Sequence, residues 1–215
     1  MTAGAPLRVS VMEVGPLMVN AYIVEDPDSK KAVVIDPGDD GDALLGEIRT
    51  RGLSVEKILL THGHFDHVGA VRLLRDATGA AVYLHGEDAG RMATARRQGL
   101  IFGLSVGDQP PPDVVVAEGD RIAFGGHEFL VVHTPGHTPG CVCYLCGKMA
   151  FVGDLIFAGS IGRTDLPGGS HARLLDSVRE KIFVLPDDTV LLPGHGPSTT
   201  VGEEKRTNPF FTGGY

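Results

Sequence analysis

Hydrophobic periodicity divides the chain into two regions, in each of which short strands are followed by helices. In the first region, apolar-polar alternation and short apolar runs predict strands at residues 7–14, 18–25, 32–35, 57–60 and 80–84. Apolar residues three or four positions apart predict helices at residues 40–51, 66–77 and 87–98. Strands that alternate with helices are typical of an α/β protein.

The second region repeats this order. Short apolar segments predict strands at residues 121–124, 128–132, 142–145, 149–152 and 190–192, and helical spacing predicts a helix at residues 171–183. Residues 99–113 are rich in Gly and Pro and predict a loop of the kind that often covers a binding site, and the residues after 192 predict a loose tail. We expect two sheets packed together with helices on their outer faces, in one domain that spans residues 1–215.

The composition is that of a globular protein. Of the 215 residues, 42% are hydrophobic and 21% are charged, so the chain can bury a large core without disulfide bonds or a structural metal. Cys141, Cys143 and Cys146, an odd number in one short segment, favour a reducing compartment and are expected to be core residues. The sequence has no run of 18 apolar residues and no secretory signal, so we expect a cytoplasmic protein that does not bind membranes.

The charge of the chain restricts the class of partner. The chain has 19 Lys and Arg against 27 Asp and Glu, which gives a formal net charge of −8 at pH 7. The sequence contains no basic stripe, and both observations argue against nucleic acid as the main partner. The sequence leaves the oligomeric state open.

The segment from Thr61 to His67 carries the strongest chemical signal in the sequence. It reads Thr-His-Gly-His-Phe-Asp-His, follows a predicted buried strand and opens a predicted helix. His62 and His64 are two positions apart in an extended backbone, so their side chains point the same way and can reach one ion. Asp66 and His67 lie at the start of the helix, project elsewhere and can hold a second ion. The segment therefore predicts a metal site rather than a polar loop that happens to be rich in His.

Three further candidate ligands follow predicted strands in the second region. His137 lies in Thr-Pro-Gly-His-Thr-Pro-Gly, Asp154 lies in Val-Gly-Asp, and His195 lies in Pro-Gly-His-Gly. Residues at the ends of strands lie at the rim of a sheet, where functional sites are usually built. Each could be a turn residue by itself, but with the first segment they supply seven imidazole and carboxylate ligands.

These residues resemble the motif of the metallo-β-lactamase superfamily, His-x-His-x-Asp-His followed by His, Asp and His, and the resemblance runs from about residue 7 to the C-terminus. Within the superfamily, the chain most resembles the short glyoxalase II proteins of the GloC type. The segments that carry this resemblance are Gly-Arg-Thr-Asp at 162–165, Pro-Gly-Gly-Ser at 167–170, Pro-Gly-His-Gly-Pro at 193–197, Glu-Glu-Lys at 203–205 and Asn-Pro-Phe at 208–210. The resemblance implies a four-layer αββα sandwich with a dinuclear metal site at one edge of the sheets.

The resemblance also implies a role for each ligand. His62, His64 and His137 would bind one ion, Asp66, His67 and His195 would bind the other, and Asp154 would bridge the two. Asp66 and Asp154 are therefore also the candidate catalytic carboxylates. Nitrogen and oxygen ligands suit zinc, iron or manganese, of which zinc is the first expectation.

Other residues near these motifs have less certain roles. Asp36 resembles the aspartate of a superfamily Asp-Pro-Gly turn, whose carboxylate supports the histidine segment; the alternative is an aspartate that only caps a turn. His85, His127, His133 and His171 match no ligand position and are expected to be structural or surface residues.

Two divalent ions a few ångströms apart would supply hydroxide at neutral pH and stabilise the oxyanion formed when a carbonyl is attacked. The sequence shows no evident general acid, and a thiolate, with a thiol pKa of about 8.5, leaves without one more readily than an amine does. The site therefore suits a thioester, and the resemblance narrows the substrate to S-D-lactoylglutathione, cleaved to D-lactate and glutathione. Arg163 is the candidate for binding a substrate carboxylate. The C-terminal helical glutathione-binding domain of longer glyoxalase II proteins is not expected.

Other functions stay open at this point. A glutathione-linked persulfide dioxygenase of the same superfamily would use one Fe(II) held by His62, His137 and Asp154. A lactonase or β-lactamase would hydrolyse ring substrates, and a nuclease is disfavoured by the net charge of −8. A non-enzymatic binding module would be expected to have lost ligands, and none of the seven is lost.

Overall fold

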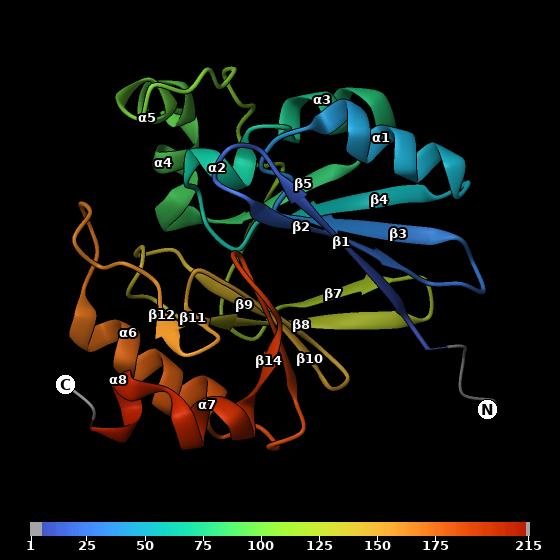
Figure 1. Ribbon diagram of the computed structural model, residues 1–215. Coiled ribbons are helices and arrows are strands. Elements are labelled where there is room, and N and C mark those ends of the chain that lie inside the picture. Colours follow the sequence, from blue (N-terminus) through green and yellow to red (C-terminus); the bar gives the residue numbers. More distant parts are fainter. Residues whose placement is uncertain (1–5, 214–215) are drawn as a thin grey trace.

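The computed structural model describes residues 6–213, which form two sheets packed face to face and a short separate hairpin (Figure 1). The first sheet has the spatial order β1-β2-β3-β4-β5-β6 and consists of β1 (Arg8–Val14), β2 (Val19–Glu25), β3 (Lys31–Ile35), β4 (Ser54–Leu59), β5 (Ala81–His85) and β6 (Val114–Val116). The second sheet has the order β14-β13-β10-β9-β8-β7 and consists of β7 (Arg121–Phe124), β8 (His127–His133), β9 (Val142–Cys146), β10 (Met149–Gly153), β13 (Val190–Pro193) and β14 (Thr199–Thr200). The hairpin consists of β11 (Ile156–Phe157) and β12 (Ser160–Ile161).

Helices cover the outer face of each sheet, so the predicted four-layer αββα arrangement is confirmed. Those associated with the first sheet are α1 (Gly41–Thr50), α2 (Phe65–Val68), α3 (Val71–Thr78), the short η1 (Gly86–Asp88), α4 (Ala89–Ala93) and α5 (Ala95–Ile101). Those associated with the second sheet are α6 (His171–Ser177), η2 (Val178–Ile182), α7 (Val201–Thr207) and α8 (Pro209–Thr212). In the part of the chain that is described, no helix is long and apolar enough to cross a membrane.

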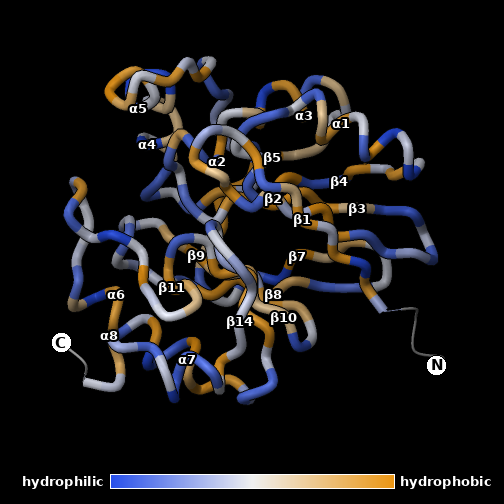
Figure 2. Tube along the Cα trace, in the orientation of Figure 1, coloured by the Kyte–Doolittle hydropathy of each residue, from blue (hydrophilic) through white to orange (hydrophobic). Residues whose placement is uncertain are grey.

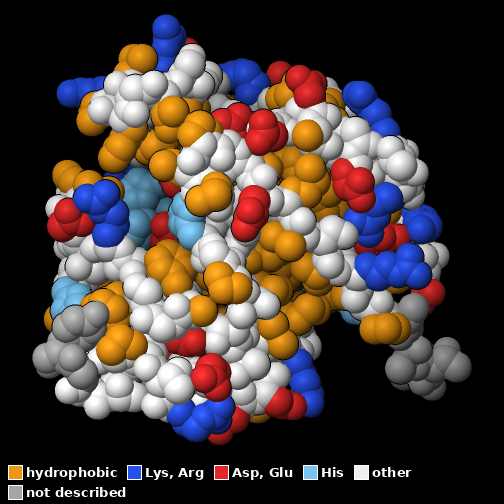
Figure 3. All heavy atoms as spheres, in the orientation of Figure 1, with side chains coloured by type: hydrophobic (Ala, Val, Ile, Leu, Met, Phe, Trp, Pro, Cys, Tyr) orange, Lys and Arg blue, Asp and Glu red, His pale blue; other side chains and the backbone are white. Residues whose placement is uncertain are grey.

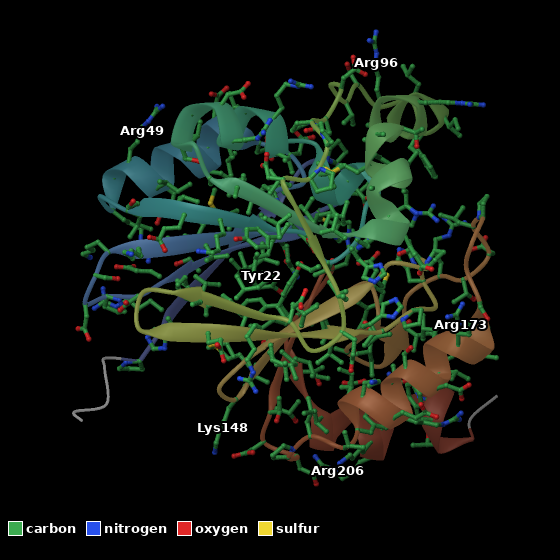
Figure 4. The ribbon with its side chains drawn as sticks, turned by 180° about the vertical axis from the view of Figure 1, so that it is seen from behind. Tyr22, Arg49, Arg96, Lys148, Arg173 and Arg206 are labelled. Carbon is green, nitrogen blue, oxygen red and sulfur yellow. The ribbon has the colours of Figure 1, made fainter. Side chains whose placement is uncertain are left out.

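Strand alternation separates the cores on the two faces of each sheet. In β2, Tyr22 and Val24 pack between the two sheets, whereas Ala21 and Ile23 pack under the helices. This follows from the geometry of a strand, in which successive side chains point to opposite faces. The hydroxyl of Tyr22 crosses the sandwich and donates a hydrogen bond to the carbonyl of Pro193 at 2.7 Å. Figure 4 shows Tyr22 in this middle layer.

Two of the predicted helices are broken. The helix expected at residues 66–77 is divided into α2 and α3, because the backbone N–H of Ala70 donates to the carbonyl of Pro37 at 3.0 Å. At the break, a Cβ on Gly69 would lie 2.2 Å from the carbonyl oxygen of Gly38, so only glycine allows the two backbones to approach this closely. The helix expected at residues 87–98 is likewise divided into η1, α4 and α5, and α5 continues to Ile101.

The prediction of a loose C-terminal tail is wrong, because residues 201–212 form α7 and α8. Thr200 caps α7 by accepting a hydrogen bond from the backbone of Glu203, and the buried Asn208 caps α8 in the same way. The three-residue strand β6 and the hairpin of β11 and β12 were also not predicted. The expectation of core cysteines is confirmed: all three are free and buried, and Cys143 and Cys146 pack on opposite faces of the second sheet.

Candidate metal centre

The structure brings the seven predicted ligands together at one edge of the sandwich. They lie on the segments that follow β4, β8, β10 and β13 and are His62, His64, Asp66, His67, His137, Asp154 and His195. Figure 3 shows histidine side chains at the bottom of a hollow on this edge, with hydrophobic side chains around it. Each sheet contributes to the cluster, because the first four residues follow a strand of the first sheet and the last three follow strands of the second.

One group of three, the first triad, consists of His62, His64 and His137. Nδ1 of His64 lies 2.8 Å from Nε2 of His137, and the latter lies 3.2 Å from Nε2 of His62. All three side chains are buried. Three imidazole nitrogens that converge in this way fit a single ion.

The second triad consists of Asp66, His67 and His195. Oδ2 of Asp66 lies 3.8 Å from Nε2 of His67 and 3.6 Å from Nε2 of His195. This separation of one carboxylate and two imidazoles also fits one ion, since the three ligating atoms lie within 4.8 Å of one another.

Asp154 lies between the triads. Its Oδ2 is 3.6 Å from Nε2 of His137 and 3.7 Å from Nε2 of His195, and its Oδ1 is 3.4 Å from Nε2 of His67. Oδ1 of Asp154 and Nε2 of His67 are buried and, within residues 6–213, have no hydrogen-bond partner. Buried polar atoms rarely stay unpaired. A metal ion between the triads would satisfy both atoms, so the residues present fit the metal site that the sequence predicts.

The pKa values of the imidazoles agree with a metal site. Burial lowers the pKa of His62 well below its usual value and lowers the pKa of His64 to about 3, so both rings are neutral and able to act as ligands. Burial also acts to lower the pKa of His67, but the neighbouring carboxylates, Asp154 first, outweigh it and raise that pKa well above its usual value. The second triad therefore favours a positive charge at the position where an ion would lie.

Hydrogen bonds on the far side of the rings fix their orientation. Nδ1 of His67 donates to Asp36 at 3.0 Å, Nδ1 of His137 donates to the carbonyl of Arg163 at 2.7 Å, and Nδ1 of His195 donates to the carbonyl of Leu17 at 3.0 Å. Because Nδ1 of each ring is engaged in this way, Nε2 of each ring faces the cluster. Of the two roles that the sequence left open for Asp36, these contacts and its bonds to Thr61 agree with support of the histidine segment.

Asp88 is a buried residue that the sequence did not single out. Its Oδ2 accepts hydrogen bonds from the backbone of Gly63 and the hydroxyl of Thr138, each at 2.8 Å, and its Oδ1 accepts from the backbone of Gly140 at 3.1 Å. The carboxylate thus joins the segment that carries the first histidines to the segment that carries His137. The sequence did offer one signal for this role: Asp88 follows the end of β5, just as the seven candidate ligands follow the ends of other strands.

Arg91 and Asn20 were also missed. Nη1 of Arg91 lies 3.5 Å from Nε2 of His64, and Nη2 donates to the carbonyl of Pro167 at 2.9 Å. The side-chain amide of Asn20 donates to the carbonyls of Pro193 and Gly196, which flank the last histidine ligand. A polar amide in a strand that is otherwise apolar up to Val24 is a sequence signal for such a role.

A third group of possible ligands, His85, Glu87 and His133, lies outside the predicted set. The two rings stack in nearly parallel planes, with centroids 4.4 Å apart, and Nε2 of His133 donates to the carbonyl of Pro139 at 2.8 Å. Nδ1 of His85 also accepts a hydrogen bond from the backbone of Glu87, so a ring nitrogen of each histidine already bonds to the backbone. The structural role predicted for both histidines therefore agrees with their geometry.

The candidate metal centre opens into a cavity of about 830 Å³. Arg163 lies on its wall as predicted, but its guanidinium makes two hydrogen bonds of 2.8 Å to the carboxylate of Asp165. A substrate carboxylate would have to replace Asp165 at this position. The guanidinium is thus placed to bind a carboxylate in the bidentate manner that the sequence suggests.

Comparison with known proteins agrees with this geometry. The family model described as the metallo-beta-lactamase superfamily matches residues 14–195, which include all seven candidate ligands. The chain belongs to the metallo-β-lactamase superfamily. A superfamily member named hydroxyacylglutathione hydrolase GloC, from Haemophilus influenzae, is 38% identical over 208 residues, which are 95% of this chain and 98% of that protein.

Two solved structures are similar over almost the whole chain. The structure titled BLEG-1 B3 metallo-beta-lactamase is 41% identical with a TM-score of 0.87 and covers 95% of this chain and 100% of its own. The structure titled TTHA1623 in a di-iron-bound form is 45% identical with a TM-score of 0.87 and covers 94% of this chain and 100% of its own. The chain is therefore a metallo-hydrolase of this superfamily, with His and Asp clusters suited to metal binding.

Proposed function

We propose that the chain is a thioester hydrolase that binds two divalent ions per chain and cleaves S-D-lactoylglutathione to D-lactate and glutathione. The observation that carries this proposal is the pair of adjacent triads with Asp154 between them at the base of one cavity. The similarity to the protein named GloC supports the substrate, and the similarity to a di-iron-bound structure supports the number of ions. Zinc is the first candidate, and iron or manganese would suit the same ligands.

In the proposed reaction, water adds to the thioester carbonyl and the carbon–sulfur bond breaks, which gives a carboxylate, a thiolate and two protons that pass to solvent. When bound, two divalent ions would supply hydroxide at neutral pH and positive charge for the developing oxyanion. Asp66 and Asp154 line the cavity beside the imidazoles, and their oxygens can accept hydrogen bonds from the attacking water. We propose these two carboxylates as the catalytic residues.

The leaving group decides between a thioester and an amide. Apart from the proposed ligands, the described residues that line the cavity include no Tyr, Lys, Cys or His. Their one carboxylate, Glu87, is exposed and faces His133, 3.9 Å from its Nε2. A thiolate leaves without a proton, because its conjugate acid has a pKa of about 8.5, whereas an amine needs one. The cavity wall therefore favours thioesters over peptides.

The proposal is tested by elemental analysis of the purified protein combined with turnover of S-D-lactoylglutathione. We expect about two ions per chain and loss of both ions and turnover in Asp154→Asn. Asp188→Asn, at an exposed aspartate paired with Lys148, is the matched control and should retain both. A protein that holds two ions and does not cleave the thioester would overturn the proposed function.

The same preparation tests two other functions. The similarity to a structure titled as a B3 metallo-beta-lactamase favours β-lactam hydrolysis as a second candidate, measured with a chromogenic cephalosporin. A single iron under metal-replete conditions, with oxygen uptake on glutathione persulfide, would identify a persulfide dioxygenase instead.

A further inference from the structure

The cavity above the metal centre has a largely apolar wall. Seven hydrophobic side chains face it, and we call them the apolar wall: Leu17, Phe65, Ile101, Phe102, Phe157, Ile161 and Leu166. They come from the turn between β1 and β2, from α2 and the end of α5, and from the segment that includes β11 and β12. In Figure 3 hydrophobic side chains lie above and below the hollow that contains the histidines.

The part of the wall at the end of α5 is strongly exposed. Ile101 and Phe102 are 74% and 49% exposed, and the ring of Phe102 stacks on the buried Phe65 with centroids 5.2 Å apart. Figure 2 shows a hydrophobic segment at this outer end of the molecule. The free energy falls when a ligand covers exposed apolar groups of this size. The contact with Phe65 holds Phe102 in place before any ligand arrives.

The two guanidinium groups that line the cavity already have polar partners. Nη2 of Arg91 donates to the carbonyl of Pro167, and Nε of Arg91 is buried 3.8 Å from Oδ1 of Asp88 without a hydrogen-bond partner among the described residues. The guanidinium of Arg163 is paired with Asp165. A carboxylate on the ligand would have to replace Asp165 at the guanidinium of Arg163. Covering the apolar wall requires no such exchange.

We propose that the apolar wall binds an apolar acyl group and that the preferred substrates are thioesters of medium-length or aromatic acyl groups rather than of the small, polar lactoyl group. This inference rests on the proposed thioester hydrolase function and deepens it. A cavity of about 830 Å³ lies in the upper part of the range for ligand sites and accommodates an acyl chain beside the thiol carrier.

The test is a series of glutathione thioesters that differ only in the acyl chain: acetyl, butanoyl, hexanoyl and octanoyl, with D-lactoyl as reference. We expect kcat/KM to rise by up to about fourfold for each methylene that leaves water, or about 200-fold from acetyl to hexanoyl. In Ile101→Ala and Phe102→Ala the increase should fall below about twofold per methylene. Both side chains are exposed, so neither variant should fail to fold.

Leu100→Ala is the matched control, because Leu100 is 65% exposed on the same helix and does not line the cavity. It should keep the full dependence on chain length. If kcat/KM is the same along the series while D-lactoylglutathione is cleaved, the apolar wall does not bind the acyl group and the inference is wrong, although the proposed function stands. If no thioester is cleaved, the proposed function itself fails.

A second copy of the chain is the alternative occupant of the apolar wall. Light scattering of the parent and of Ile101→Ala distinguishes this case. A dimer that the substitution dissociates, together with rates that do not depend on chain length, would assign the apolar wall to an interface and overturn the inference.

Discussion

Replacement of Asp88 by Asn tests whether this residue positions the metal ligands or only supports the fold. The carboxylate accepts hydrogen bonds from Gly63, Thr138 and Gly140 and is fully buried. Gly63 lies between the first two histidines of the first triad, and Thr138 directly follows the third. Asp88 thus holds all three ligands of that triad in register.

The expected magnitude follows from these contacts. The amide nitrogen of Asn cannot accept a hydrogen bond, so in Asp88→Asn the buried N–H of either Gly63 or Gly140 loses its partner, at a cost of about 1–3 kcal/mol in the free energy of unfolding. Partners that orient metal ligands typically contribute about 10- to 100-fold to metal affinity. We expect one ion to bind about 10- to 100-fold more weakly and the second, held by Asp66, His67 and His195, to bind almost normally.

The assay is a competition titration of the metal-free protein against a chromophoric zinc chelator, with urea unfolding as a second measurement. Asp120→Asn is the matched control, because the carboxylate of Asp120 also accepts from a backbone N–H, that of Ala117 at 2.8 Å, but in an exposed turn. It should leave both affinities unchanged. If Asp88→Asn loses stability yet binds both ions as tightly as the parent, Asp88 supports the fold alone and the reasoning is refuted.

Three further predictions concern other contacts. In Gly194→Ala the new Cβ would lie 2.3 Å from a carboxylate oxygen of Asp154, so elemental analysis should find less metal in this variant than in the parent. The control is Gly46→Ala, where the new Cβ meets open space; it should keep its metal and stabilise its helix by about 1 kcal/mol. Arg163→Ala should lower kcat/KM for S-D-lactoylglutathione by about 10- to 150-fold and leave a neutral thioester unaffected, and an equal loss for both substrates would contradict a role in carboxylate binding. The hydrogen bond from Lys30 lowers the pKa of the buried Glu25, so ionised Glu25 stabilises the fold above its unfolded-state pKa of about 4.3. The parent and Glu25→Gln should therefore differ in unfolding free energy at pH 7. This difference should vanish as the pH falls through the lowered pKa.

Most strands and the segment that carries the first ligands could be predicted because they depend on local sequence patterns. Strand alternation correctly placed most strands, since residues such as Val33 and Val34 must pack on opposite faces of a sheet. The ligand segment could be recognised because its spacing within one loop sets which side chains share an ion. The family and the layered fold followed from these patterns and are confirmed.

What the sequence missed depends on contacts between distant residues or on very short elements. The break between α2 and α3 arises because Gly38 and Gly69 approach each other, and no local pattern encodes that contact. Strand β6 consists of three valines, a run too short to show the alternation by which the longer strands were recognised. The helices after residue 200 did have a signal, because Thr200 and Glu203 have the spacing of a capped helix start.

The arrangement of the ligands links metal binding to the packing of the sandwich. His62 and His64 follow the first sheet and His137 follows the second, and the other triad is divided between the sheets in the same way. An ion in either triad therefore joins two sheets that otherwise associate through their apolar faces. Binding to the folded state alone adds RT ln(1 + [L]/Kd) to stability, about 4 kcal/mol at 1,000 times Kd. Substitutions at Asp88 or Asn20, which hold the ligand segments without touching an ion, should consequently cost more stability in the metal-loaded protein than in the metal-free protein.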